Sequence, residues 1–213
     1  MEKINKAPLS LLILESTSSR EKIYRFIQFL IRFLSPIQKT KYCQAVYLFL
    51  QKINWNVSIT RHINRFGMAL SLINQIKQKY FNKNIKTLTI SEILQLGGTF
   101  CILVFSIVDH FILLSKIKAF NAIPLQTLFK TLGVFWFLGN TTQLIHLLSL
   151  PNIQRKSVKE RCNIIKCLCD YIIIFHFSTK ERILPNWICG LAGMISSALG
   201  LYTKYLITDK EEN

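Results

Sequence analysis

The stretch SITRHINRFGMALSLINQIKQKY, residues Ser58 to Tyr80, decides the fold that this chain is expected to adopt. Its strongest apolar residues recur at gaps of four, three, four and three, which places them along one side of an α-helix. We name this side the apolar stripe, and it consists of Ile59, Ile63, Phe66, Leu70 and Ile73.

The apolar stripe needs an apolar cover, and either packed helices or the acyl boundary of a bilayer would supply one. Basic residues flank the stripe and the stretch contains no acid, which favours a membrane surface. We therefore predict that the stripe inserts into one leaflet. The basic residues expected to contact lipid phosphates are Arg61, Arg65, Lys77 and Lys79. The alternative is a core helix of an ordinary helical domain.

Composition also points to a membrane. Half of the 213 residues are hydrophobic, and 27 Lys and Arg against 11 acids give a net charge of +16. Through Ser91 the chain carries 15 basic residues and 3 acids, so its first part is the more basic one. The basic residues lie singly between apolar ones and form no nucleic-acid-binding signature, so anionic phospholipid is the expected partner and nucleic acid is not.

The pattern along the chain predicts an all-α fold with amphipathic helices followed by a membrane-embedded helical half. Helices are expected over 20–34, over 40–53 and, after a break at 54–56, over the opening stretch. The expected divisions are a tail over 1–17, an amphipathic region over 18–81, a linker over 82–92, a membrane-associated region over 93–207 and a tail over 208–213.

Two later segments are long and apolar enough to be considered as membrane spans. Residues 94–114 hold Asp109, which is costly at a bilayer centre, so this segment is either interfacial or turns Asp109 toward a helix bundle. Residues 187–207 are charge-free until Lys204, and we predict a Gly-rich C-terminal transmembrane helix there. Its small residues would allow close helix packing, and they are Gly190, Gly193, Ser196, Ser197 and Gly200.

The remaining apolar segments are harder to assign. Polar residues from Asn140 to Gln143 interrupt 131–150, which predicts a hairpin or a half-buried helix. A shorter helix is expected over 162–177. It carries cysteines whose spacing is not that of a zinc site, so no metal site is predicted and buried free thiols are expected. No nucleotide-binding, hydrolase or metalloprotease motif occurs, so neither an enzyme nor a cofactor is expected.

Several ordered motifs resemble the peroxin 11 family. The run from Gly190 to Tyr202, GLAGMISSALGLY, resembles the glycine-rich end of that family. Arg25 with Gln28 matches an early helix motif, and Arg65 with Gly67 matches a later segment. The other matches are Asp109-His110 followed by Ser115-Lys116, with Leu113 where an aromatic residue is usual, and the pair Cys169-Asp170.

This resemblance implies a peroxisomal membrane protein that remodels and elongates the organelle and so promotes its proliferation and fission. It further implies insertion of an amphipathic helix, self-association and recruitment of fission machinery that includes a dynamin-like GTPase. The alternative function is an oligomeric pore for small metabolites, which would use Asp109, Asp170 and the polar residues 140–143.

Overall fold

The structure, a computed structural model, describes residues 17–34, 36, 44–80, 88–120, 122–150, 157–178 and 184–211. Within these ranges the regular elements are helices and no strand occurs, which confirms the predicted all-α fold. The helices are α2 (Thr17–Phe33), α3 (Gln44–Tyr80), α4 (Ile90–Lys116), α5 (Leu125–Ser149), α7 (Val158–Ser178) and α8 (Asn186–Glu211).

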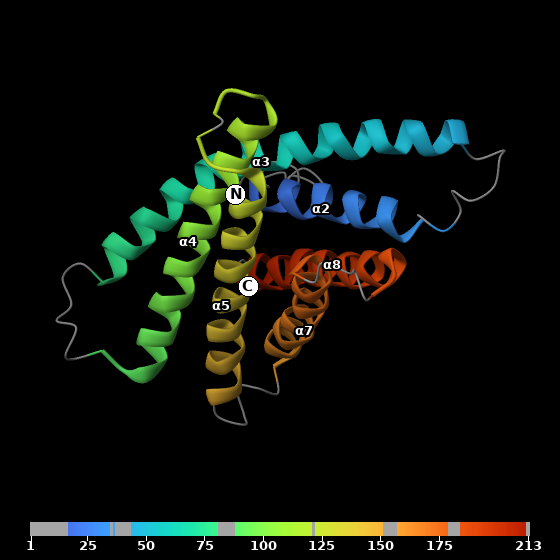
Figure 1. Cartoon of the computed structure of the whole chain (residues 1–213). Helices are drawn as coiled ribbons and strands as arrows, with labels where there is room; N and C mark the ends of the chain where they lie inside the picture. Colours follow the sequence, from blue (N-terminus) through green and yellow to red (C-terminus); the bar gives the residue numbers. More distant parts are fainter. Residues whose placement is uncertain are drawn as a thin grey trace, which may run out of the picture.

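The helices pack in two groups that α3 and α5 connect (Figure 1). The helices α4 and α5 form an antiparallel pair, while α2 lies beside α8 and α7 packs on α8. The long helix α3 contacts both α2 and α4, and α5 contacts α7. The chain therefore joins an early helix, α2, to the last helix, α8, by direct packing.

Each group has a small apolar core. One cluster lies between α2, α7 and α8 and contains Phe29, Cys169, Ile173, Cys189 and Ala192. The other lies between α4 and α5 and contains Val108, Ile112 and Leu128. Because both clusters are small, many large apolar side chains stay on the outside of the described helices.

The expected break at 54–56 is wrong, because α3 continues through it. This segment holds neither Gly nor Pro, so no residue in it forces a helix to end. The side chain of Gln28 on α2 donates a hydrogen bond to the backbone oxygen of Asn54 at 3.5 Å, so α2 contacts the helix at this point.

The later elements also differ from expectation in their bounds. Helix α4 begins inside the expected linker, where Thr89 caps it: its hydroxyl accepts from the backbone N–H of Glu92, whose side chain in turn accepts from the backbone N–H of Thr89. Residues 81–87 lie outside the described residues. Helix α5 is one continuous helix, which agrees with the half-buried helix and not with the hairpin. In its polar insert, Asn140 donates to the backbone oxygen of Cys167 at 2.9 Å.

Candidate membrane-contact and ion-pair site

Helix α3 turns its apolar side outward. Ile63, Leu70 and Ile73 expose 57%, 58% and 46% of their surface, which is unusual for three such residues on one helix side. Ile59 is partly buried, and the side chain of Phe66 lies outside the described part of the structure. The exposed members of the apolar stripe therefore lie free of the other described helices.

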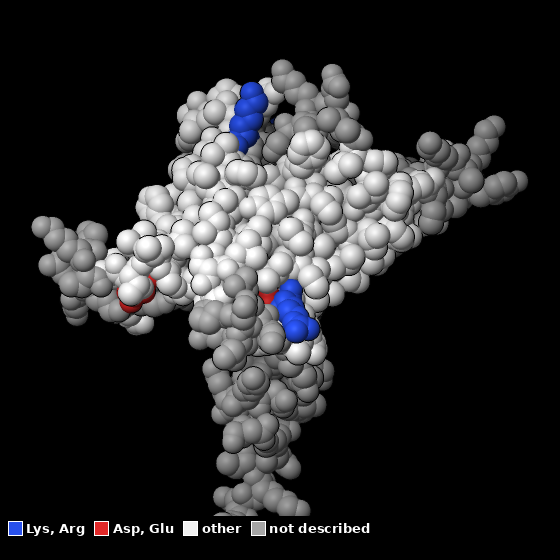
Figure 2. All heavy atoms as spheres, turned by 90° about the horizontal axis from the view of Figure 1, so that it is seen from below, with Lys and Arg blue, Asp and Glu red and all other residues white. Residues whose placement is uncertain are grey.

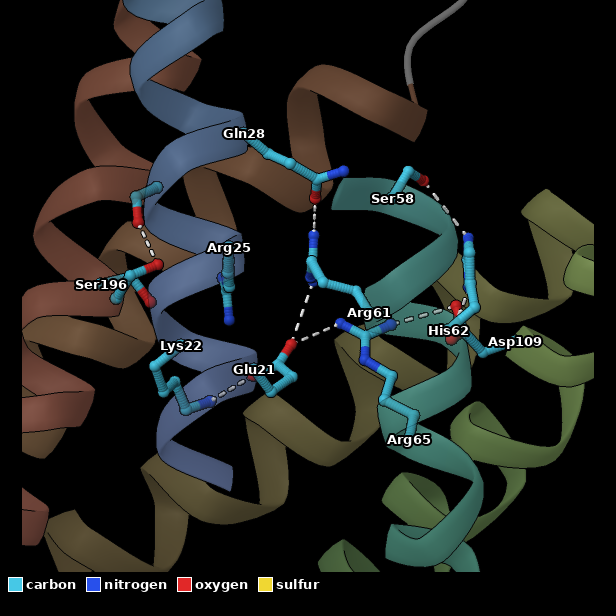
Figure 3. Close-up of polar contacts among 12 residues, drawn as sticks. Glu21, Lys22, Arg25, Gln28, Ser58, Arg61, His62, Arg65, Asp109 and Ser196 are labelled. Carbon is cyan, nitrogen blue, oxygen red and sulfur yellow. Dashed lines mark hydrogen bonds and ion pairs between the residues drawn. The ribbon is translucent and has the colours of Figure 1, made fainter. Parts of the chain in front are cut away.

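The opposite side of α3 faces α2, and charged residues meet there around one carboxylate (Figure 3). Glu21 Oε1 lies 3.1 Å from Arg61 Nη2 and 2.9 Å from Arg65 Nη2. Lys22 Nζ lies 3.4 Å from Glu21 Oε2. Arg61 also donates to the side-chain oxygen of Gln28. A single buried acid on α2 thus holds two arginines of α3.

A second carboxylate joins α3 to α4. Asp109 Oδ1 lies 3.0 Å from Arg65 Nη1, and Asp109 Oδ2 lies 2.7 Å from His62 Nδ1. The other ring nitrogen of His62, Nε2, lies 3.0 Å from Lys116 Nζ. Because the lysine ammonium can only donate, His62 Nε2 accepts, and its Nδ1–H donates to Asp109. We call Glu21, Lys22, Arg61, His62, Arg65 and Asp109 the ion-pair cluster.

Burial and neighbouring charges act on the pKa values of this cluster in opposite directions. Burial alone would raise the pKa of Glu21, but Lys22, Arg65 and Arg61 hold it well below its usual value. Burial also lowers the pKa of Arg61, to about 9, and the neighbouring Arg65 adds to this effect. Burial lowers the pKa of His62 as well, against the attraction of Asp109, in keeping with a neutral ring.

A second buried ion pair ties α2 to α7 and α8. Arg25 of α2 pairs with Asp170 Oδ1, which also accepts a hydrogen bond from Ser196 Oγ at 2.6 Å. The Arg25 guanidinium lies 5.6 Å and 5.4 Å from the ring centroids of Phe29 and Trp136. Although burial would raise the pKa of Asp170, Arg25 and other cations hold it below its usual value. Helix α2 is therefore bound on both sides through carboxylates.

The small residues of α8 pack against α2 inside the chain. A Cβ at Gly190 would lie 2.7 Å from Phe33 Cα, and a Cβ at Gly193 would overlap the Phe29 ring. Gly200 lies beside Lys22, and both Ser196 and Ser197 are fully buried. The predicted helix-packing face thus serves the α2–α8 contact within the chain.

The residues expected to contact lipid phosphates fall into different environments. Arg61 and Arg65 are largely buried in the ion-pair cluster, so in this structure they contact carboxylates rather than solvent. Lys77 is exposed, and the side chain of Lys79 lies outside the described part. Sequence reasoning did not identify the carboxylate partners, because Glu21 and Asp109 are about forty residues from Arg61 and Arg65 along the chain. The one sequence feature that could have indicated a carboxylate partner is that Glu21 stands alone among basic residues.

The described helix that qualifies as a candidate membrane span is not the one predicted. Among the described helices, α4 alone has the length and hydropathy that a bilayer crossing needs. The Gly-rich helix α8, expected to be the transmembrane helix, is not the helix that meets this criterion, because Ser196, Ser197, Thr203 and Lys204 lower its hydropathy. Asp109 lies within α4 and faces α3, as the helix-bundle alternative required.

The cysteines of α7 are buried thiols. Cys162, Cys167 and Cys169 are each less than 10% exposed, and burial raises the pKa of Cys167 to about 11. Within the described ranges, no group of three His, Cys, Asp or Glu side chains is arranged to hold a metal ion.

Comparison with known proteins places this arrangement in a family. Residues 9–150, which make up two thirds of the chain, match the family described as peroxisomal biogenesis factor 11 (PEX11). Neither a curated protein nor a solved structure gives a significant match. The family match covers α2, α3, α4 and α5, and thus the whole ion-pair cluster. The chain belongs to the peroxisomal biogenesis factor 11 family, in agreement with the resemblance of its motifs.

Proposed function

We propose that this protein remodels the peroxisomal membrane by inserting the apolar stripe of α3 into one leaflet, which elongates the organelle before proliferation and fission. One observation carries the proposal: Ile63, Leu70 and Ile73 of the stripe are exposed, while the polar side of the same helix is held by buried ion pairs. Exposure of these apolar side chains to water is unfavourable, whereas the acyl boundary of a bilayer would bury them.

The ion-pair cluster fixes the depth at which α3 would lie. Asp109 is seven residues before the end of α4 at Lys116, which corresponds to about 10 Å along the helix axis. Interfacial helices lie about 5–10 Å deep in the boundary between headgroups and acyl chains. If α4 spans the bilayer, the cluster holds α3 close to this depth at the end of the span. A helix inserted in one leaflet widens that leaflet and favours positive curvature.

The charge and the surface of the protein support a lipid partner. Lys52 and Lys77 are exposed on α3, and each surface lysine adds about 1 kcal/mol to binding on anionic lipid. Figure 2, which views the molecule from below, shows a broad surface where charged side chains are visible at only a few places. We extend the proposal to self-association through faces other than the α2–α8 contact, and to recruitment of fission machinery that includes a dynamin-like GTPase.

The test uses the full chain, reconstituted into vesicles that contain phosphatidylcholine and phosphatidylserine. Replacing Leu70 and Ile73 with Asp places two charges on the exposed stripe, and we expect tubulation seen by electron microscopy to be lost. The matched control is Ser71→Asp with Gln75→Asp, which adds the same two charges at exposed polar positions of α3 and should leave tubulation intact. Undiminished tubulation by the Leu70→Asp, Ile73→Asp variant would refute the proposal.

The pore remains the second candidate, and the side chains expected to line it have other partners. Asp109 is paired with Arg65 and His62, Asp170 with Arg25, and Asn140 donates to a backbone oxygen of α7. These contacts favour a structural role for the three residues. Conductance measured across planar bilayers that contain the purified chain decides between the two functions: ion currents that Asp170→Asn alters would favour the pore.

A further inference from the structure

Lys116 brings an ammonium group to the point where α3 crosses the end of α4. Its Nζ lies 3.3 Å from Ser58 Oγ and 3.0 Å from His62 Nε2, both on α3. It also lies 6.0 Å from the centroid of the Trp55 ring. Within the described ranges no carboxylate lies within ion-pair distance of Lys116, so its charge is not neutralised by a direct partner.

The nearest acid, Asp109, already has a partner for each of its carboxylate oxygens. Asp109 uses Oδ1 for Arg65 and Oδ2 for His62, and the pKa of His62 is lowered by burial. A neutral His62 that accepts from Lys116 transfers no negative charge to it. The side of Lys116 that faces away from Asp109 therefore carries a surplus positive charge, which a bound anion would compensate.

The groups around this charge can donate hydrogen bonds to an anion. Trp55, Ser58 and His62 follow one another at gaps of three and four, so they share one side of α3. Figure 3 shows the Ser58 side chain pointing toward the His62 ring. Trp55 is 51% exposed, and its indole N–H is a donor.

Three carbonyl groups at the end of α4 already accept hydrogen bonds from the backbone that follows. The backbone N–H of Ile117 donates to Leu113 O, and that of Lys118 donates to Ser115 O. The N–H groups of Ala119 and Phe120 both donate to Leu114 O. These bonds satisfy oxygens that would otherwise point outward from the last turn of the helix.

We propose that Lys116, Ser58 and Trp55 form a binding site for the phosphate of an anionic phospholipid headgroup. Lysine supplies the charge, while serine and tryptophan supply neutral donors, and tryptophan is common at the level of membrane headgroups. The site deepens the proposed function and rests on it, because it requires the end of α4 to lie at the membrane surface. It gives α3 a point of attachment to one lipid molecule, separate from the apolar stripe.

The experiment uses the indole N–H signal of Trp55 in nuclear magnetic resonance spectra of the full chain in neutral detergent micelles. The chain has 3 tryptophans, and Trp55→Phe assigns the signal. Three probes are titrated: dihexanoyl phosphatidylglycerol, whose phosphate is its only charge, dihexanoyl phosphatidylcholine, and inorganic phosphate. We expect saturable shifts with phosphatidylglycerol and none with phosphatidylcholine. Equal responses to both lipids would overturn the proposal, and so would equal affinity for inorganic phosphate, which would assign the site to free phosphate.

Two lysines give a matched comparison. Lys116→Gln should weaken phosphatidylglycerol binding about tenfold, as expected for a lost hydrogen bond to a charged group. Lys118→Gln removes the same charge two residues away at an exposed position and should change binding less than about twofold. Equal losses in the two variants would mean diffuse attraction to basic surface and would overturn the site.

Further variants protect this test against misfolding and against failure of the proposed function. Ser58→Ala keeps the lysine and should weaken binding by a smaller factor, while Lys116→Arg should restore most of the affinity lost in Lys116→Gln. The Leu70→Asp, Ile73→Asp variant should keep the Trp55 response even though its tubulation is lost. Normal binding of phosphatidylglycerol by a variant that no longer tubulates vesicles would show that the lipid site and the remodelling activity can be tested separately.

Discussion

Asp109 joins two helices through its two carboxylate oxygens, one for Arg65 and one for His62. Because its surroundings are buried, removing its charge would leave Arg65 with only one of its two acidic partners, Glu21. Breaking a buried ion pair by removing one partner usually costs about 3–5 kcal/mol. The single residue therefore has a large effect on how firmly α3 is held.

We expect Asp109→Asn to lower the free energy of unfolding by about 3 kcal/mol, because the amide keeps the shape but cannot neutralise Arg65. The measurement is equilibrium unfolding of the full chain in detergent, followed by circular dichroism. Lys77→Gln, at an exposed position of α3, is the control and should change stability by less than about 0.5 kcal/mol. Equal stability of Asp109→Asn and the wild type would show that the pairing contributes little.

At the level of elements, the contact between α2 and α8 depends on missing side chains. A Cβ at Gly190 would lie 2.9 Å from Phe29 O and 2.7 Å from Phe33 Cα, and both are backbone atoms that cannot rotate away. Gly190→Ala should therefore push the two helices apart and cost about 1–3 kcal/mol, a loss measured by the same unfolding experiment.

Gly97 on α4 provides the matched control for this prediction. A Cβ there meets no atom within 4 Å, so Gly97→Ala should gain helix propensity, by up to about 1 kcal/mol, without a clash. If the two variants had equal free energies of unfolding, the result would contradict close packing of α2 on α8.

The sequence predicts where helices form better than it predicts which helices pack against one another. The gaps between Ile63, Leu70 and Ile73 predict an α-helix, and the structure contains one. Periodicity does not say which side of a helix faces inward, because burial of Arg61 and Arg65 depends on acids from distant segments. Likewise, Gly190 and Gly193 predict a close helix contact, but their spacing does not identify α2 as the neighbour.

At the scale of the whole molecule, two carboxylates hold α2 in place, and both should respond to acid. The pKa of Glu21 lies below its usual 4.5 and that of Asp170 below its usual 3.8. As pH falls, the unfolded chain binds protons at these usual values before the folded chain does. The stabilisation is therefore complete above pH 4.5 and decreases as pH falls through 4.5 toward the lower folded values.

We expect the unfolding free energy of the wild type to decrease steeply over that acidic range, with α2 separating from α3 and α8. Arg25 lies over the Trp136 ring, so the fluorescence of a Trp55→Phe, Trp187→Phe background, which keeps Trp136 alone, would follow the change. Glu21→Gln should be less stable at neutral pH and lose stability less steeply in acid, since one of the titrating carboxylates is gone. Parallel curves for this variant and the wild type would exclude Glu21 as the source of the acid sensitivity.

The pairing of α2 with α8 has a consequence for synthesis of the protein. A ribosome makes α2 long before α8, so the nascent helix emerges with Phe29 and Arg25 lacking the neighbours that later enclose them. Helix α7 supplies part of that shelter through Ile173 and Asp170, and the rest follows only when Ala192 and Ser196 have been translated. The packing around α2 is therefore completed late in synthesis, by residues from the opposite end of the chain.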